Sequence, residues 1–203
     1  MSNIETIKTA AEIIKKGGVV IFPTETVYGI GADVFNLKAI ERIFNIKGRC
    51  FSNPLSVHIS NKKDIQKIAV NLNKIAEIII EKFLPGPLTI VLEKNKNIPD
   101  EVTAGKKTVG VRIPDHTVAL KFIEESETFI AAPSANFSGK KSPSNISEIP
   151  EKILSSVDFV LDYGKTKIGI PSTVIDLTQN PPVILREGAI KKQEIEAVVG
   201  ILK

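Results

Sequence analysis

The sequence contains one cysteine, no tryptophan and only two histidines, and each shortage narrows the possible chemistry. The lone Cys50 cannot form an internal disulfide and favours a reducing compartment, so we expect a cytoplasmic protein. His58 and His116 lie far apart in the sequence, so we expect no zinc cage and no metal held by the protein alone. Aromatic residues make up 5% of the chain, which leaves isoleucine, valine and leucine to fill the core.

Long apolar runs and targeting signals are also missing. The longest apolar stretches, such as residues 19–22, are far too short to cross a bilayer. Residues 1–5 lack the basic and apolar regions of a signal peptide. We therefore expect no association with a membrane.

The net charge is also small, at +4, because 27 basic residues are nearly balanced by 23 acidic ones. The small positive excess suits an anionic ligand such as a nucleotide, or weak contact with RNA. On charge alone, a solvated surface slightly richer in lysine explains it better.

Helix-like and strand-like segments alternate along the chain without a repeat, a low-complexity tract or a linker. Apolar periodicity predicts helices over residues 4–16, 37–46, 73–83, 115–125 and 192–199, with Asn36, Asn73 and Asp115 as caps. Short apolar runs predict strands at 19–22, 55–59, 88–92, 108–113, 128–132, 158–162, 172–177 and 183–185. This pattern predicts one layered α/β domain over residues 1–203 with a mixed sheet.

Two familiar phosphate-binding motifs begin in the sequence but are not completed. Residues 29–31 match the start of a dinucleotide fingerprint, whose third glycine would fall on Val34. Residues 164–166 match the end of a P-loop, whose first glycine would fall on Phe159. Neither motif supports a function.

Polar residues instead gather in four segments beside predicted strands, where open α/β sheets bind ligands. The first segment, residues 23–29 (PTETVYG), packs two hydroxyls, a carboxylate and a phenol between a proline and a glycine. It can present donors and acceptors to a small polar ligand. A hydrogen-bonded turn explains it equally well.

The second segment places Lys47 and Arg49 just past a helix end, with Gly48 allowing a tight bend between them. Two cations in one loop can converge on a triphosphate, although they can equally complement the helix C-terminal dipole. Asn53 follows in an Asn-Pro-Leu stretch. His58 lies in the next apolar strand, where a lone histidine is more often structural.

The third segment is the strand 108–113, in which Thr108, Gly110 and Arg112 share one face by alternation. An arginine on a face that also carries a glycine has room for a ligand carboxylate. An arginine on an edge strand in water is the competing interpretation.

The fourth segment, residues 131–136, carries Ser134 and Asn136, which can bond phosphate or ribose oxygens. Alone it is more typical of a generic turn. Ser172 and Arg186 add polar groups beside late strands.

Taken together, these segments resemble the YrdC/TsaC family of threonylcarbamoyl-adenylate synthases. The matches are PTETVYG, KGR followed by NPL and a histidine, FLPGPLT, TVGVRIP, APSAN, PSTV and ILREG, in the family's order from about Gly18 to Gly188. The family's Lys-x-Arg and Ser-x-Asn signature falls on Lys47, Arg49, Ser134 and Asn136.

The resemblance implies a single-domain twisted mixed sheet flanked by helices, with a concave basic cleft. It implies a nucleotidyltransferase that converts L-threonine, bicarbonate or CO2 and ATP into threonylcarbamoyl-AMP and pyrophosphate. Mg²⁺ would accompany ATP. The product would pass to a transferase complex that modifies the tRNA adenosine next to the anticodon, and contact with tRNA or double-stranded RNA is part of the same expectation.

Site residues also carry over by resemblance. The catalytic signature is Lys47, Arg49, Ser134 and Asn136. The implied ATP-binding residues are Lys47, Arg49, Asn53, Thr108, Ser134, Ser142 and Arg186. The implied L-threonine-binding residues are Thr26, His58, Arg112, Ala132 through its backbone, and Ser172, with Arg112 pairing with the threonine carboxylate.

Two flanking positions depart from the pattern, since many relatives have proline where Cys50 and Glu187 stand. The sequence resembles the short branch of the family, because the longer branch adds a C-terminal domain after a linker. Two alternatives stay open: a carbamoyl transfer like that of hydrogenase-maturation enzymes, which are long multidomain chains, and an RNA-binding module without synthase activity. The latter is disfavoured by the modest charge and by scattered aromatic residues.

Overall fold

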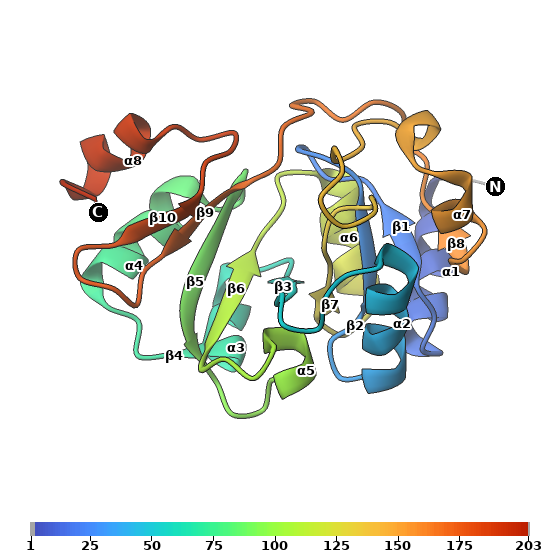
Figure 1. The fold of residues 1–203 in the computed structure, drawn as a ribbon, viewed down its shortest axis with the longest axis horizontal. Helices are drawn as coiled ribbons and strands as arrows, with labels where there is room; N and C mark the ends of the chain where they lie inside the picture. Colours follow the sequence, from blue (N-terminus) through green and yellow to red (C-terminus); the bar gives the residue numbers. More distant parts are fainter. Residues whose placement is uncertain (1–2, 203) are drawn as a thin grey trace.

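The protein folds around one ten-stranded mixed sheet with helices on both faces, as a computed structural model that describes residues 3–202 shows (Figure 1). The strands are β1 (Val20–Phe22), β2 (Gly29–Asp33), β3 (Ser56–His58), β4 (Ala69–Val70), β5 (Leu88–Lys94), β6 (Thr108–Arg112), β7 (Ile130–Ala131), β8 (Phe159–Val160), β9 (Thr173–Asp176) and β10 (Val183–Arg186). Their spatial order is β10-β9-β5-β6-β3-β7-β2-β1-β8, with β4 paired to β5.

The helices are α1 (Asn3–Lys15), α2 (Leu37–Lys47), α3 (Ile65–Ile68), α4 (Lys74–Phe83), α5 (Asp100–Thr103), α6 (Thr117–Glu125), α7 (Glu151–Leu154) and α8 (Lys192–Val199). Two 3₁₀ turns, η1 (Lys62–Asp64) and η2 (Ile146–Glu148), complete the set within residues 3–202. No helix in this range has the length and apolar character needed to cross a membrane.

Strand β1 explains why the sheet is covered on both faces. Successive side chains of a strand point to opposite faces, and here both faces are apolar. Ile21 joins the larger core cluster, which includes α2, α4 and α8, whereas Val20 and Phe22 join a second cluster with α1 and α6. In Figure 1, α2 lies in front of this part of the sheet, whereas α1 and α6 lie behind it.

Strand β6 confirms the predicted alternation and excludes one interpretation of Arg112. Val109 and Val111 are buried in the larger core, while Thr108, Gly110 and Arg112 line the opposite side. Because β6 pairs with β5 on one side and with β3 on the other, it is not an edge strand. The alternative of an edge-strand arginine in water is therefore wrong.

Several predicted boundaries are corrected by the structure. Helix α6 is capped by His116, not by Asp115: the His116 Nδ1 accepts from the Ala119 N–H at 3.4 Å. Sequence reasoning missed the two-residue strand β4 and the strand β2, which pairs antiparallel with β1 from Gly29 opposite Phe22. Strand β2 is short and follows a polar loop, so its sequence carries little periodicity. The pairing with β1 and β7 makes it a strand.

Candidate active site

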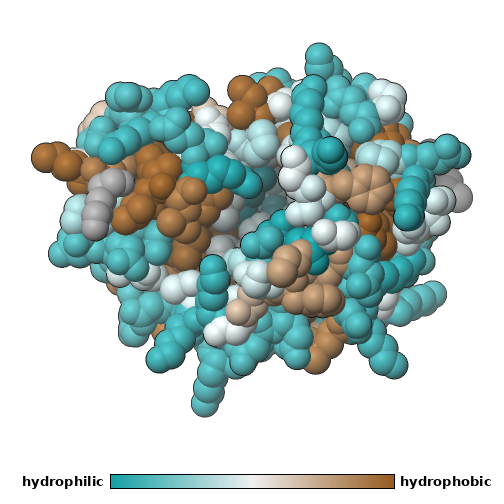
Figure 2. Space-filling model, in the orientation of Figure 1, coloured by the Kyte–Doolittle hydropathy of each residue, from teal (hydrophilic) through white to brown (hydrophobic). Residues whose placement is uncertain are grey.

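A cavity of about 980 Å³ opens above strands β5, β6 and β9, under the loops that follow β1, α2 and β7. Figure 2 shows this side of the molecule hollowed near its centre. Nine of the predicted site residues line it: Arg49, Asn53, His58, Thr108, Arg112, Ala132, Ser134, Ser172 and Arg186. Four others do not line it: Thr26, Lys47, Asn136 and Ser142. The fold thus gathers most of the predicted set from six separate segments.

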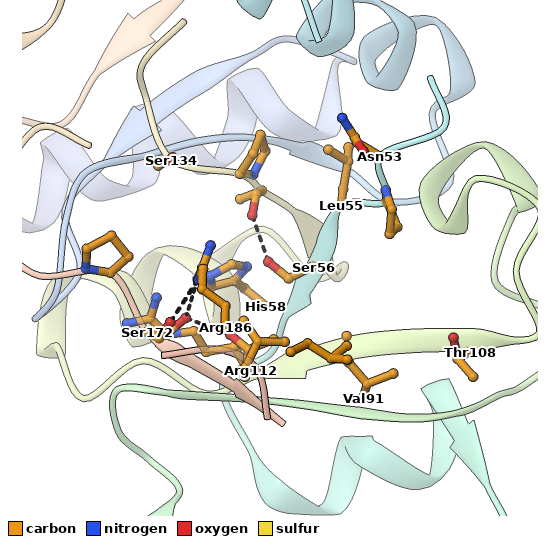
Figure 3. A pocket seen from close by; sticks show the side chains of 18 of the residues that line it. Asn53, Leu55, Ser56, His58, Val91, Thr108, Arg112, Ser134, Ser172 and Arg186 are labelled. Atoms are coloured by element: carbon orange, nitrogen blue, oxygen red, sulfur yellow. Dashed lines mark hydrogen bonds between the residues drawn. The ribbon is translucent and has the colours of Figure 1, made fainter. Parts of the chain in front are cut away.

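Four of the predicted residues in the lining lie close together. In Figure 3, His58, Arg112, Ser172 and Arg186 crowd together, whereas Asn53 and Thr108 lie away from them. At about 980 Å³, the cavity is large enough for two ligands or for two chemically different parts of one ligand.

Arg112 is the most deeply buried cation of the cavity, at 5% exposure. Its Nη2 donates to Thr26 Oγ1 at 2.6 Å and lies 3.0 Å from Glu25 Oε1. Burial lowers the pKa of Arg112, and the Glu25 carboxylate opposes this effect. The Nε of Arg112 is buried without a hydrogen-bond partner. An unpaired buried donor is costly, so this N–H is suited to a ligand oxygen.

His58 in β3 presents a second unsatisfied atom. The side chain is 4% exposed, its ring meets Phe22 edge-on, and its Nδ1 has no hydrogen-bond partner. Burial, followed by the charge of Arg112, lowers the pKa of His58 to about 3. The imidazole is therefore neutral at physiological pH, and its Nδ1 can form one hydrogen bond with a ligand. The orphaned nitrogen argues against a purely structural histidine.

Arg49 and Arg186 bring two more guanidinium groups to the same cavity. Arg49 donates to the carbonyl oxygens of Asn53 (3.0 Å) and Pro54 (2.8 Å). Arg186 donates to the Ser172 carbonyl and, at 3.2 Å, to the Ser172 hydroxyl. Burial lowers the pKa of Arg186, and the charges of Arg112 and Arg49 lower it further. Three guanidinium groups that line one cavity favour an anionic ligand.

The Lys-Gly-Arg loop sends its two cations to different places. Gly48 adopts a left-handed conformation (φ 56°), which ends α2 and lets the chain reverse. Arg49 then lies at the cavity, whereas Lys47 points into the protein and is 2% exposed. Burial, with a smaller effect from Arg49, lowers the pKa of Lys47 to about 7.

The segment after β7 forms the opposite wall. Ala132 and Ser134 line the cavity, and the Ala132 carbonyl accepts from Ser56 Oγ at 2.9 Å. Asn136 lies behind Ser134 with its side chain buried. Ser142 is half-buried outside the lining.

Sequence reasoning missed four residues at or beside the site. Glu25, the buried counter-ion of Arg112, was part of the PTETVYG segment but had no assigned partner. Thr89 of β5 bonds Ser172 across strands, hydroxyl to hydroxyl, at 2.8 Å. Lys106 and Lys107 also line the cavity. Their position just before the TVGVRIP motif was the available signal.

Comparison with known proteins gives consistent matches. The Sua5/YciO/YrdC family model, described as telomere recombination, matches residues 12–188. A threonylcarbamoyl-AMP synthase of Pyrococcus abyssi is 47% identical over 197 residues, which cover 97% of this chain and 58% of that protein. A putative threonylcarbamoyl-AMP synthase of Methanocaldococcus jannaschii is 43% identical over 95% of this chain and 92% of its own length.

Solved structures agree with these sequence matches. The crystal structure of P. abyssi Sua5 complexed with L-threonine superposes with a TM-score of 0.94 at 47% identity. That match covers 97% of this chain and 58% of the P. abyssi chain. This chain therefore spans little more than half the length of that relative.

Proposed function

This chain belongs to the Sua5/YciO/YrdC family, and we propose that it is a threonylcarbamoyl-AMP synthase. In this reaction L-threonine, bicarbonate or CO2 and ATP give threonylcarbamoyl-AMP and pyrophosphate. Relatives at 42–47% identity bear this name. The observation that carries the proposal is the convergence of Arg49, Arg112 and Arg186 on one cavity that also holds two unsatisfied buried nitrogens.

Threonine belongs at the buried end of the cavity in this proposal. The free Nε of Arg112 takes a carboxylate oxygen, and the neutral His58 offers one hydrogen bond to the amino or hydroxyl group. Thr26 acts from behind by holding Arg112. The Ala132 backbone and Ser172 complete this end.

ATP takes the rest of the cavity, with its triphosphate near Arg49 and Arg186. Asn53, Thr108 and Ser134 line this region. Lys47 and Ser142 of the predicted ATP site, and Asn136 of the predicted catalytic signature, do not line the cavity, so in this proposal they act from behind its wall. Guanidinium groups bind phosphate oxygens through paired N–H donors, which suits Arg49 and Arg186.

The chemistry needs no side-chain nucleophile. The threonine amine attacks CO2 and loses a proton, which gives a carbamate. A carbamate oxygen then attacks the α-phosphorus of ATP, and the bond to the β-phosphate oxygen breaks to release pyrophosphate. The protein positions the two substrates and stabilises the negative charge that develops on the phosphates. Loss of one such donor costs about 2.7–4 kcal/mol of barrier in a well-studied enzyme.

Mg²⁺ fits this site as a companion of ATP. Among residues 3–202 there is no cluster of three or more His, Cys, Asp or Glu side chains able to hold a metal, and Asp176 is the carboxylate that lines the cavity. Mg²⁺ commonly keeps several waters and binds through substrate phosphates with few protein ligands. When bound, it would neutralise phosphate charge.

The same proposal gives the protein its setting. The catalytic unit is one domain over residues 1–203, because every described strand joins a single sheet. The labile product passes in the cytoplasm to a transferase complex that modifies tRNA. RNA binding as the sole function is less favoured, because the aromatic side chains of the described lining, Tyr28 and His58, are buried and offer no stacking surface.

Threonine-dependent release of pyrophosphate tests the proposal. Purified protein is incubated with ATP, Mg²⁺ and bicarbonate, with L-threonine, L-serine or no amino acid. We expect release that requires threonine and is lost in Arg49→Ala. Arg42→Ala is the matched control, because Arg42 pairs with Asp158 away from the cavity lining and should retain activity. Folded protein that binds ATP but shows no threonine dependence would overturn the assignment.

A further inference from the structure

Lys47 carries the first position of the family signature, yet its side chain is directed away from the cavity. The residue ends α2, and Gly48 turns the chain so that Arg49, not Lys47, reaches the lining. At 2% exposure, the Lys47 side chain has no open surface for a ligand.

The acceptors around Lys47 Nζ all belong to one loop. The amine donates to the carbonyl oxygens of Ser134 and Asn136 and lies 3.4 Å from Asn136 Oδ1. An ammonium group has three N–H donors, so these three oxygens match its full capacity. In the other direction, the Lys47 carbonyl accepts from the Ser138 N–H at 3.0 Å. Helix α2 and the loop are therefore joined from both sides.

Asn136 closes the network within the loop. Its Oδ1 accepts from the Ser134 hydroxyl, and its Nδ2 donates to the carbonyls of Phe137 (3.0 Å) and Lys140. Lys47, Ser134 and Asn136 thus hold one another and fold residues 134–140 into a compact turn. Ser134 is the member of this trio that lines the cavity.

Satisfied and unsatisfied atoms separate the two kinds of site residue. The buried side-chain atoms left without a hydrogen bond among the described residues belong to Glu25, His58 and Arg112. None belongs to Lys47 or Asn136. The Glu25 carboxylate is ion-paired with Arg112, whereas His58 Nδ1 and Arg112 Nε have no partner. Polar atoms that await a ligand stay unpaired in its absence, whereas the side-chain atoms of Lys47 and Asn136 are already paired within the protein.

We propose that Lys47 is a positioning residue, which clamps the loop 134–140 and thereby fixes Ser134 at the cavity wall, and that it does not contact the phosphates of ATP. The role of Ser134 in ATP binding rests on the proposed function. The hydrogen bonds between Lys47 and the loop do not depend on it. The clamp exists in the protein without substrates. The hydrogen bonds of Lys47 go to the loop and not into the cavity.

Hydrogen exchange of the ligand-free protein tests the clamp without any assumption about activity. In Lys47→Met, we expect the amides of Ala135, Ser138 and Lys140 to exchange about tenfold faster, as the loss of charge-assisted bonds implies. Lys15→Met is the matched control, because Lys15 ends α1 but pairs only with surface carboxylates. Asn136→Ala removes the loop side of the clamp and should accelerate the same amides if Lys47→Met does not fold.

A double-mutant cycle tests whether Lys47 acts through the loop. If it does, Ser134→Ala raises the KM for ATP in the wild type but adds nothing in the Lys47→Met background. In Lys47→Met the KM for ATP should rise, whereas the affinity for threonine should change little. Thermal unfolding should show that the variant remains folded at the assay temperature. Unaltered loop exchange, together with additive effects of the two substitutions on the KM for ATP, would overturn the proposal in favour of a direct phosphate contact. Absence of synthase activity in the wild type would refute the proposed function and leave the exchange test intact.

Discussion

Glu25 and Arg112 form a buried ion pair, with Glu25 Oε1 3.0 Å from Arg112 Nη2 and both side chains at most 6% exposed. The pair leaves Arg112 Nε without a hydrogen-bond partner, and Arg112 lines the cavity from β6. A buried arginine without a counter-ion would destabilise the fold, so Arg112 needs Glu25 in order to occupy this buried position.

Glu25→Gln is expected to weaken both the fold and threonine binding. Removal of one partner of a buried ion pair costs about 3–5 kcal/mol of unfolding free energy, and the amide should retain part of this through its shape. Urea unfolding and calorimetric titration with threonine measure the two effects. The surface pair of Lys121 and Glu124 offers the control, because Glu124→Gln should change stability by less than about 1 kcal/mol. Equal effects of the two substitutions would contradict a special role for Glu25.

Arg186→Ala is expected to raise the dissociation constant for ATP by about tenfold to a hundredfold, the range for one lost charge-assisted hydrogen bond of about 1.5–3 kcal/mol. The substitution removes one of three convergent guanidinium groups and frees the Ser172 carbonyl. Fluorescence or calorimetric titration with ATP measures it, with Arg42→Ala as the arginine control outside the cavity lining. An unchanged ATP affinity in Arg186→Ala would exclude Arg186 from the nucleotide site.

His58 is expected to stay neutral well below the usual histidine range. Its folded pKa of about 3 lies below the value of about 6.5 for an unfolded histidine. The unfolded chain therefore binds the proton first, and His58 makes stability fall as the pH drops from about 6.5 towards 3. Above about pH 6.5 this loss is absent.

Proton NMR can follow His58, because the chain has only two histidines. His58→Gln identifies which imidazole signal belongs to His58. We expect that signal to remain unshifted between pH 8 and pH 5. Below pH 6.5 the stability of the wild type should fall more steeply than that of His58→Gln, by up to about 1.4 kcal/mol per pH unit. A midpoint near pH 6.5 for His58 would show that the ring is exposed to water.

Gly188→Ala is expected to disturb Ser172 through the backbone. A Cβ at Gly188 would lie 2.4 Å from the Pro171 carbonyl oxygen and 2.5 Å from the Ser172 carbonyl carbon, so the chain would have to move. Overpacking of this kind costs about 1–3 kcal/mol or more. Thermal unfolding and threonine titration should both report the change.

Gly200→Ala is the control for this substitution. Gly200 has a positive φ of 85° but open space around its Cβ position, so it reports backbone strain without a clash. We expect Gly200→Ala to leave threonine affinity unchanged. If Gly188→Ala also leaves it unchanged, Ser172 does not depend on this packing.

The amino-acid sequence by itself determined the elements whose signals are local. Helix α4 begins where predicted, because Asn73 accepts from the Ala76 N–H only three residues away. In β6 the alternation of valines with Gly110 and Arg112 assigned the core face, since a strand has a side-chain period of two. The order of motifs identified the family without reference to any contact.

Only the tertiary structure decided which polar residues meet and which are already satisfied. Strand β2 exists because β1 and β7 supply its hydrogen bonds, and Arg112 meets Thr26 from 86 positions away. Lys47 and Arg49 are only two positions apart, yet Lys47 is buried and Arg49 lies at the cavity. The left-handed Gly48 reverses the chain between them. Such outcomes depend on pairing across the fold and on burial, and no pattern within a short window of sequence encodes either one.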